Sequence, residues 1–263
     1  MPDSPRTAAL RPFWDRPDVS GVFSDFDGTL SPIVLDPTTA HAHPGAVDVL
    51  ARLVAHVGRV GVISGRRASF LAEHLGGRGL LLSGLYGLEE VDDSTGAVVR
   101  PPGAARWQQV VDDVAAAAEA ATTGALAGVD VERKGLSLTL HFRRRPEREP
   151  TARRWAEGAA DRSGLVAHVA RMAVELRPPL PADKGTALVA AAAGLEQVCF
   201  IGDDFADLAA FDALDSLAQE GRGVLRVAVT SDEGPSSLVE RADLVVPGVP
   251  GAVELLQELL AGF

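Results

Sequence analysis

The stretch GVFSDFDGT, residues 21–29, decides the fold of this chain. Its first four residues are apolar or small and show no helical period, so they predict a short buried strand. Two aspartates, Asp25 and Asp27, follow where that strand ends. An isolated Asp-x-Asp-Gly segment is often only a turn with side-chain hydrogen bonds to the backbone. Directly after a buried strand, the same segment favours the ligand-binding edge of a parallel sheet.

Strands and helices alternate along the chain on the C-terminal side of this stretch. Residues 44–57 have helical spacing, and short apolar runs at 60–63 and 80–82 predict strands. The last third of the chain predicts three further strands and three helices, at residues 198–201, 225–229 and 244–246, and at residues 184–193, 207–214 and 249–260. This alternation predicts an α/β fold, in which helices cover a parallel sheet on both faces.

The middle of the chain has a different pattern between two proline-rich segments, residues 101–103 and 178–181. An alanine-rich helix is predicted first, followed by two strands around a turn at Lys134 and Gly135. These elements are of the α+β kind. We therefore expect a core domain from residues 1–102 and 181–263, and a smaller inserted α+β domain from residues 103–180.

Composition and charge exclude several classes of protein. The 263 residues include 25 Lys and Arg against 36 Asp and Glu, so the net charge of −11 argues against a general nucleic-acid or membrane-surface binder. Cys199 is the only cysteine, so an intrachain disulfide or a cysteine zinc cluster is excluded. The first residues resemble no signal peptide, so we expect a cytoplasmic protein. Residues 1–19 contain several prolines, and we expect them to be loosely held.

Polar side chains gather at three predicted strand ends. They are Asp25, Asp27 and Thr29 after the first strand, Ser64 and Arg66 after the second, and Asp203 and Asp204 after a third, with Lys184 at a helix start before it. Singly, these residues could be helix caps or a surface charge. If the three strands are neighbours, the carboxylates would raise one another's pKa unless a cation intervened. Mg²⁺ suits such oxygen ligands, and with a lysine and a hydroxyl it would make a phosphate cradle.

This ordered set resembles the haloacid-dehalogenase-like (HAD) phosphatase superfamily, and within it most closely the trehalose-6-phosphate phosphatase family. The resemblance covers nearly the whole chain. It is carried by residues 25–33 (DFDGTLSPI), 63–66 (ISGR), 84–89 (GLYGLE), 131–137 (VERKGLS), 174–178 (VELRP), 183–185 (DKG) and 202–204 (GDD). It implies a HAD-like Rossmannoid core with a parallel sheet, and an inserted cap domain that selects the substrate.

The resemblance also implies roles for the core residues. Asp25 would be the nucleophile that forms an aspartyl-phosphate, and Asp27 would be the general acid and then the general base. Ser64 and Lys184 would bind the phosphoryl oxygens. Mg²⁺ would be held by Asp25, by the backbone carbonyl of Asp27 and by Asp203. Four further residues would support the site: Thr29, Arg66, Asp204 and Asp207.

In the cap, the resemblance implies that Glu132, Lys134 and Glu175 bind the sugar. Carboxylates accept hydrogen bonds from hydroxyls and a lysine donates them, which suits a polyol. A purely structural reading, in which these charges lie on an exposed strand face, stays open. Alternation over residues 137–143 predicts apolar side chains on the core face and polar ones, including a structural His141, on the other. The turn leaves the face of Glu132 open.

One departure from the family pattern leaves alternatives. After the second aspartate of GDD and one variable position, the family continues Thr-Asp-Glu, whereas this chain has Ala206, Asp207 and Leu208. The first hypothesis is a Mg²⁺-dependent phosphatase that releases trehalose and phosphate from trehalose 6-phosphate. The alternatives are a phosphatase for another sugar phosphate, of glucosylglycerol or mannosylglycerate type, and a weakly active regulatory domain that partners a trehalose-phosphate synthase. We expect a monomer without nucleic-acid or membrane partners.

Overall fold

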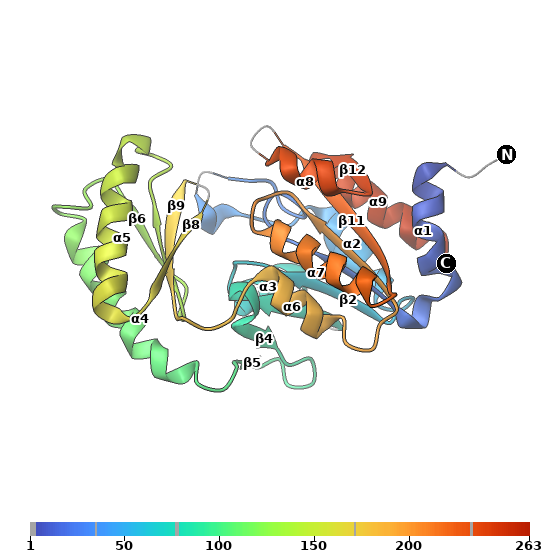
Figure 1. Ribbon diagram of the computed structural model, residues 1–263, viewed down its shortest axis with the longest axis horizontal. Coiled ribbons are helices and arrows are strands. Elements are labelled where there is room, and N and C mark those ends of the chain that lie inside the picture. The colour runs from blue at the N-terminus through green and yellow to red at the C-terminus, as the bar shows by residue number, and fades with distance from the viewer. Residues whose placement is uncertain (1–3, 35, 77–78, 171, 232–233) are drawn as a thin grey trace. The chain divides into compact units, whose positions relative to one another are not determined.

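The computed structural model describes residues 4–34, 36–76, 79–170, 172–231 and 234–263 (Figure 1). The chain divides into two compact units, Met1–Val99 with Ala182–Phe263, and Arg100–Pro181. We call the first the core unit and the second the inserted unit. The inserted unit interrupts the core unit between two of its elements, close to the two proline-rich segments.

The core unit is built on an eight-stranded sheet with the strand order β12-β11-β10-β1-β2-β3-β4-β5. The strands are β1 (Ser20–Ser24), β2 (Arg59–Ile63), β3 (Leu80–Gly84), β4 (Glu89–Val91), β5 (Val98–Val99), β10 (Gln197–Gly202), β11 (Gly223–Thr230) and β12 (Leu244–Pro247). The six strands from β12 to β3 are parallel, which confirms the predicted α/β fold. The two edge strands β4 and β5 are antiparallel and were not predicted, because they are too short to show a pattern.

Helices cover both faces of this sheet (Figure 1). One face carries α1 (Pro5–Asp15), α2 (Pro44–Leu53), α3 (Ala68–Leu75) and α9 (Gly248–Ala261), and the other carries α6 (Lys184–Ala191), α7 (Asp207–Gln219) and α8 (Ser236–Arg241). Successive residues of β1 enter opposite cores, with Val22 in the first and Phe23 in the second. A strand buried on both faces reads as a continuous apolar run, which is why the sequence shows it clearly.

The N-terminal segment is ordered, so the expectation that residues 1–19 are loosely held is wrong where the structure describes them. Ser4 caps helix α1 by accepting a hydrogen bond from the backbone of Thr7. Leu10 and Phe13 of α1 are buried in the core, and Trp14 donates its indole N–H to a backbone carbonyl of α9 at 2.8 Å. The prolines misled the prediction. Pro5 lies in the first turn, where proline is compatible with a helix, and α1 also continues through Pro12.

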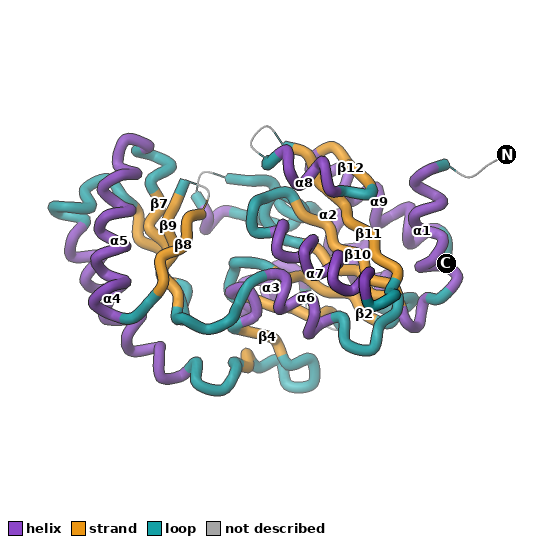
Figure 2. Tube along the Cα trace, in the orientation of Figure 1, coloured by secondary structure: helices purple, strands orange, loops and turns teal. Residues whose placement is uncertain are grey.

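The inserted unit has a four-stranded antiparallel sheet with the order β6-β7-β9-β8 (Figure 2). Its elements are β6 (Asp130–Arg133), β7 (Leu138–His141), β8 (Val166–Ala170), β9 (Ala173–Arg177), α4 (Ala105–Ala121) and α5 (Glu149–Ser163). Both helices pack on one face, against Leu138, Leu140 and Phe142. This confirms the core face predicted from alternation. Strand β8 was not predicted. Among all described residues, no helix is long and apolar enough to cross a membrane.

Candidate active site

The order of the core strands places three polar strand ends side by side. Strand β1 lies between β10 and β2, so the neighbour relationship on which the sequence argument depended is confirmed. Asp25 follows β1, Ser64 follows β2, and Asp203 follows β10. The backbone N–H of Asp25 still donates to Ile201 of β10 at 2.9 Å, which continues the sheet ladder up to the aspartate. The site therefore lies at the carboxyl edge of the parallel strands.

A buried lysine links the carboxylates of this edge. Asp25 and Lys184 are 3% and 2% exposed. The Lys184 ammonium lies 3.0 Å from Asp25 Oδ1, 2.7 Å from Asp207 Oδ1 and 3.7 Å from Asp204 Oδ1. Lys184 is the first residue of α6, whose start is fixed by a capping box at Asp183. Asp204, which the sequence placed among the supporting residues, thus lies near the Lys184 ammonium. Lys184 is a core residue of the site.

Asp207 holds both the lysine and the loop of the third strand end. Its Oδ1 accepts a hydrogen bond from Lys184, and its Oδ2 accepts backbone N–H groups of Asp203 at 2.8 Å and Asp204 at 2.9 Å. A Cβ at Gly202 would come within 2.3 Å of the Asp207 carboxyl carbon, so only glycine leaves room for it. The sequence predicted Asp207 as a supporting residue, and these contacts show how it would act.

The two positions that depart from the family pattern have ordinary surroundings. The backbone N–H of Ala206 donates to Asp204 Oδ1 at 2.9 Å, and Ala206 precedes α7 without a side-chain cap. Leu208 packs against the hydrophobic cluster beneath α6 and α7. Neither change removes a contact that Asp207 makes.

The site carries more negative than positive charge. Burial raises the pKa of Asp25 well above its ordinary value, Lys184 offsets this only in part, and the nearby carboxylates add to it. Burial also raises the pKa of Asp207 to about 6 despite Lys184. Burial would lower the pKa of Lys184, yet Asp207, Asp25 and Asp204 raise it well above its ordinary value. One ammonium therefore faces the carboxylates of Asp25, Asp204 and Asp207, and Asp203 lies beside two of them. A further cation would relieve the repulsion among these carboxylates.

The arrangement of these oxygens fits a divalent metal ion. One oxygen from each of Asp25, Asp203 and Asp207 lies within 4.8 Å of the others, and all three residues are buried. Both oxygens of Asp207 already accept hydrogen bonds, so Asp25 and Asp203 are the better ligands. Thr29 donates its hydroxyl to Asp203 Oδ1 at 3.3 Å and orients it. Buried, oxygen-only and negatively charged surroundings are those that Mg²⁺ prefers. The carbonyl of Asp27 as a third ligand stays a prediction.

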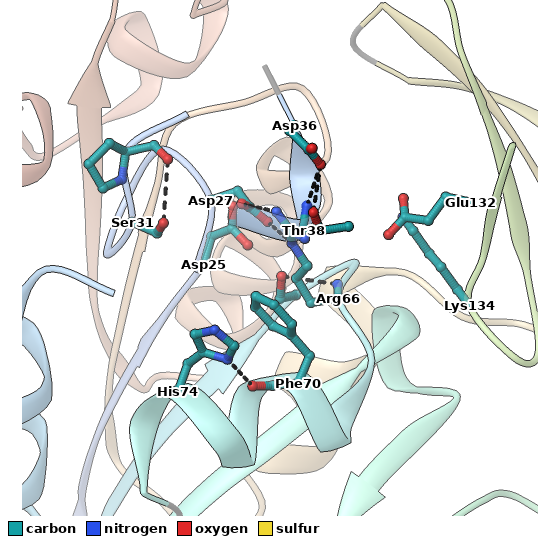
Figure 3. Close-up of polar contacts among 12 residues, drawn as sticks. Asp25, Asp27, Ser31, Asp36, Thr38, Arg66, Phe70, His74, Glu132 and Lys134 are labelled. Atoms are coloured by element: carbon teal, nitrogen blue, oxygen red, sulfur yellow. Dashed lines mark hydrogen bonds and ion pairs between the residues drawn. The ribbon is translucent and has the colours of Figure 1, made fainter. Parts of the chain in front are cut away.

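Asp27 has its own partner, separate from the lysine cluster. The guanidinium of Arg66 binds its carboxylate with two hydrogen bonds, from Nε to Oδ2 and from Nη2 to Oδ1, each 2.7 Å long (Figure 3). The sequence placed Arg66 among the supporting residues without saying what it supports.

The second strand end is braced by the segment that follows β3. Ser64 is buried, and its Oγ accepts the backbone N–H of Arg66 at 3.2 Å. The backbone N–H groups of Leu85 and Tyr86 donate to the carbonyls of Arg66 and Ser64 at 2.8 and 3.0 Å. Glu89 accepts a hydrogen bond from the first backbone N–H of α3 at 3.2 Å. The GLYGLE segment, which the sequence matched without a role, thus fixes the Ser64 loop.

In the inserted unit, the three predicted sugar-binding residues lie together. Lys134 Nζ is 3.6 Å from Glu132 Oε2 (Figure 3). It is 3.8 Å from Glu175 Oε1. Ser137 donates its hydroxyl to Glu175 Oε1 at 2.7 Å, and His141 Nε2 lies 2.8 Å from Glu132 Oε2. We call these five residues the inserted-unit cluster. The sequence read His141 as structural and missed its contact with Glu132.

The strand register settles the face on which Glu132 lies. Glu132 of β6 stands opposite Thr139 of β7, and Thr139 stands opposite Glu175 of β9. Residues directly opposite one another in a sheet share a face. Glu132 and Glu175 therefore share one face, which the sequence left open because the turn at Lys134 resets the register.

Comparison with known structures identifies the class to which this fold belongs. A haloacid dehalogenase-like hydrolase from Bacteroides thetaiotaomicron superposes with a TM-score of 0.60 at 15% identity, over 91% of this chain and 99% of that chain. The C-terminal domain of Candida albicans trehalose-6-phosphate phosphatase superposes with a TM-score of 0.78 at 24% identity, over 99% of both chains. The fold is that of the HAD-like hydrolases with an inserted domain, as the sequence predicted.

Sequence comparison narrows this class to one family. The trehalose-phosphatase family model matches residues 23–243. The trehalose-phosphate phosphatase of Mycobacterium leprae is 32% identical over 212 residues, which cover 73% of this chain and 47% of that protein. The chain belongs to the trehalose-phosphatase family. It spans about half the length of the curated relatives that it matches.

Gly28 should be indispensable to the cation site. Its φ is +83°, and a Cβ there would come within 2.1 Å of Asp203 Oδ2. We expect Gly28→Ala to abolish most of the rise in melting temperature that Mg²⁺ causes, because Asp203 must move. Gly96→Ala is the matched control, since Gly96 has a φ of +70° but no atom within 4 Å of a Cβ. It should cost only the backbone strain of about 1–2 kcal/mol. A full Mg²⁺ response in Gly28→Ala would refute this assignment.

Stabilisation by Mg²⁺ should depend on pH. The pKa of Asp207 is about 6 in the fold against an ordinary 3.8, so the folded chain binds this proton more tightly than the unfolded chain. Between about pH 4 and 6 the contribution of this group to stability falls as pH rises. Burial also raises the pKa of Asp25, a candidate ligand, and a metal ion competes with protons for its ligands. We expect Mg²⁺ to raise the melting temperature more at about pH 8 than at about pH 5, relative to EDTA. Equal rises at both pH values would contradict the prediction.

Proposed function

We propose that this chain hydrolyses trehalose 6-phosphate to trehalose and inorganic phosphate. The observation that carries the proposal is the buried Asp25 carboxylate at the end of β1, 3.0 Å from the Lys184 ammonium and beside the carboxylates of Asp203 and Asp207. A nucleophile next to a fixed cation is the arrangement that phosphoryl transfer to a carboxylate requires. Membership of the trehalose-phosphatase family supports the substrate.

The proposed reaction has two displacement steps on phosphorus. In the first, an oxygen of Asp25 attacks the phosphorus, the bond to the sugar oxygen breaks, and that oxygen leaves with the electron pair and takes a proton from Asp27. In the second, water attacks the phosphorus of the aspartyl-phosphate and gives a proton to Asp27. The bond between phosphorus and the Asp25 oxygen breaks, and phosphate is released. Asp25 is then a free carboxylate again and Asp27 is protonated. The two steps amount to covalent catalysis by Asp25. Asp27 acts as the general acid in the first step and as the general base in the second.

The other residues of the core site would bind the phosphoryl group. Lys184 and the Ser64 hydroxyl would donate hydrogen bonds to its oxygens, and Asp207 would hold Lys184 in place. Asp25 and Asp203 would hold Mg²⁺, with the carbonyl of Asp27. The ion would offset the repulsion between the Asp25 carboxylate and the anionic phosphate.

We propose that the inserted unit is the cap that selects the sugar. The inserted-unit cluster combines two carboxylates, an ammonium, a hydroxyl and an imidazole, and these groups can both accept from and donate to sugar hydroxyls. A site that hydrogen-bonds a polyol in this way discriminates against substrates that lack the hydroxyls.

The core site argues for an active enzyme and against the regulatory alternative. That alternative rests on Ala206 and Leu208, and Asp207 between them keeps its contacts with Lys184 and with the loop of the third strand end. A monomer supplies every residue that the reaction needs. We propose that its functional partner is an enzyme that makes the phosphorylated disaccharide, a trehalose-phosphate synthase.

The decisive experiment measures phosphate release from a panel of sugar phosphates, with Mg²⁺ and with EDTA. We expect a metal-dependent preference for trehalose 6-phosphate, and we expect Asp25→Asn to lower kcat at least about a thousandfold because the nucleophile is lost. Preference for another sugar phosphate would overturn the substrate while leaving the mechanism. Unchanged turnover in Asp25→Asn would overturn the mechanism.

The role of the cap residues is testable with two matched substitutions. Glu132→Gln removes a carboxylate of the inserted-unit cluster, and Glu119→Gln removes one that pairs with Arg133 elsewhere in the same unit. We expect Glu132→Gln to raise KM for trehalose 6-phosphate roughly tenfold or more, since a hydrogen bond to a charged group is lost. Hydrolysis of p-nitrophenyl phosphate, which has no sugar, should not change. Equal effects of the two substitutions, or an effect on both esters, would exclude sugar recognition by Glu132.

A further inference from the structure

Among the described residues, one partner holds the carboxylate of Asp27. Arg66 donates to both of its oxygens at 2.7 Å, from Nε and from Nη2 (Figure 3). The Asp27 side chain is 35% exposed, whereas that of Arg66 is 12% exposed. A partly exposed aspartate would otherwise move among its staggered rotamers. A two-point pair with a planar guanidinium fixes the plane of the carboxylate as well as its place.

Arg66 is itself fixed from several sides. Its backbone N–H donates to Ser64 Oγ at 3.2 Å, and its carbonyl accepts the backbone N–H of Leu85 at 2.8 Å. Its guanidinium carbon lies 4.7 Å from the centroid of the Phe70 ring, in a cation–π contact. The guanidinium of arginine is planar and rigid. Contacts that hold both the Arg66 backbone and the flat face of its guanidinium therefore fix the direction in which its two N–H donors point.

The Phe70 ring also contacts the loop that carries Asp27. The rings of Phe70 and Phe26 meet edge to face, with centroids 5.6 Å apart and an interplanar angle of 89°. Phe26 stands between Asp25 and Asp27 in the sequence and is fully buried. The ring of His74 also stacks on that of Phe70, with centroids 3.9 Å apart, and His74 Nδ1 lies 2.9 Å from the Phe70 carbonyl oxygen. One aromatic ring therefore sets the position of Arg66 relative to the catalytic loop.

We propose that Arg66, seated on Phe70, is the positioning residue of Asp27 and sets the direction in which its carboxylate exchanges a proton. The proposal rests on the proposed function, in which Asp27 protonates the sugar oxygen and later accepts a proton from water. Arg66 acts through Asp27 and needs no contact with substrate. Misplacing a catalytic group by about 1 Å can cost roughly a hundredfold in rate.

Comparing the hydrolysis of trehalose 6-phosphate with that of p-nitrophenyl phosphate distinguishes the positioning of Asp27 by Arg66 from other roles of Arg66. The leaving group of p-nitrophenyl phosphate needs no proton, so attack by Asp25 on this ester should not depend on Asp27. Hydrolysis of the aspartyl-phosphate needs Asp27 whichever ester formed it. An enzyme with a displaced Asp27 should therefore release the first p-nitrophenolate rapidly and then slow down.

For Arg66→Ala we expect kcat for trehalose 6-phosphate to fall roughly a hundredfold, with KM within about threefold. We expect p-nitrophenyl phosphate to give a burst of about one p-nitrophenolate per site, at the rate of the unsubstituted chain, followed by slow turnover. Arg66→Lys should stay impaired, because an ammonium cannot replace the two-point pair. Phe70→Leu should be impaired to a lesser degree. Arg67→Ala, which removes the neighbouring exposed arginine, is the control and should behave like the unsubstituted chain.

A double-mutant cycle completes the test. Asp27→Asn with Arg66→Ala should be no slower than Asp27→Asn alone, because Arg66 acts only through the Asp27 carboxylate, which Asp27→Asn already removes. A raised KM for both esters, loss of the burst and recovery in Arg66→Lys would overturn the proposal in favour of direct phosphate binding. A lowered melting temperature with equal losses on both esters would overturn it in favour of a purely structural role. If the unsubstituted chain does not hydrolyse trehalose 6-phosphate, the substrate assignment fails, and this test is made with the sugar phosphate that it does hydrolyse.

Discussion

The buried ammonium of Lys184 is the constraint on which the core site depends. Removing such a charge from water costs several kcal/mol, and only well-placed carboxylates offset that cost. The carboxylate oxygens of Asp25 and Asp207 lie 3.0 and 2.7 Å from the Lys184 ammonium and offset this cost. Three separate parts of the chain must therefore come together: the end of β1, the first turn of α6 and the first turn of α7. The parallel order of β1 and β10 brings the first and third of these to one edge.

The same network leaves the site with surplus negative charge, and this surplus is what prepares it for a cation. A fold selected for stability alone would pair its buried charges or exclude them. In this site the backbone instead leaves room for several buried carboxylates to lie close together. The carboxylate of Asp203 lies against Gly28, and that of Asp207 lies against Gly202. A side chain at either glycine would collide with the carboxylate beside it. The cost in conformational freedom at these glycines is thus tied to the chemistry of the site.

The sequence predicted what depends on local pattern and order along the chain. Apolar runs and helical spacing located the parallel strands, and the order of the polar strand ends brought Asp25, Lys184 and Asp203 to one site. Features that depend on distant side chains were missed. The Arg66–Asp27 pair spans 39 residues, and the Arg66 guanidinium lies over the Phe70 ring. The face of Glu132 was set by strand pairing, and helix α1 was hidden by its prolines, although its apolar residues are buried.

Asp25 and Asp27 are two residues apart, yet the fold gives them opposite surroundings. Asp25 continues the strand ladder, is buried, and faces an ammonium that would also donate to a phosphate oxygen. Asp27 lies past the strand end, is one-third exposed, and faces a guanidinium that fixes its direction. A single flexible loop could not separate two carboxylates so sharply. The separation comes from Phe26 between them, which is anchored in the core against Phe70. One buried ring thereby divides the loop into a half that suits the proposed nucleophile and a half that suits the proposed acid and base. Such a division of two carboxylates by their surroundings would let one site support both roles.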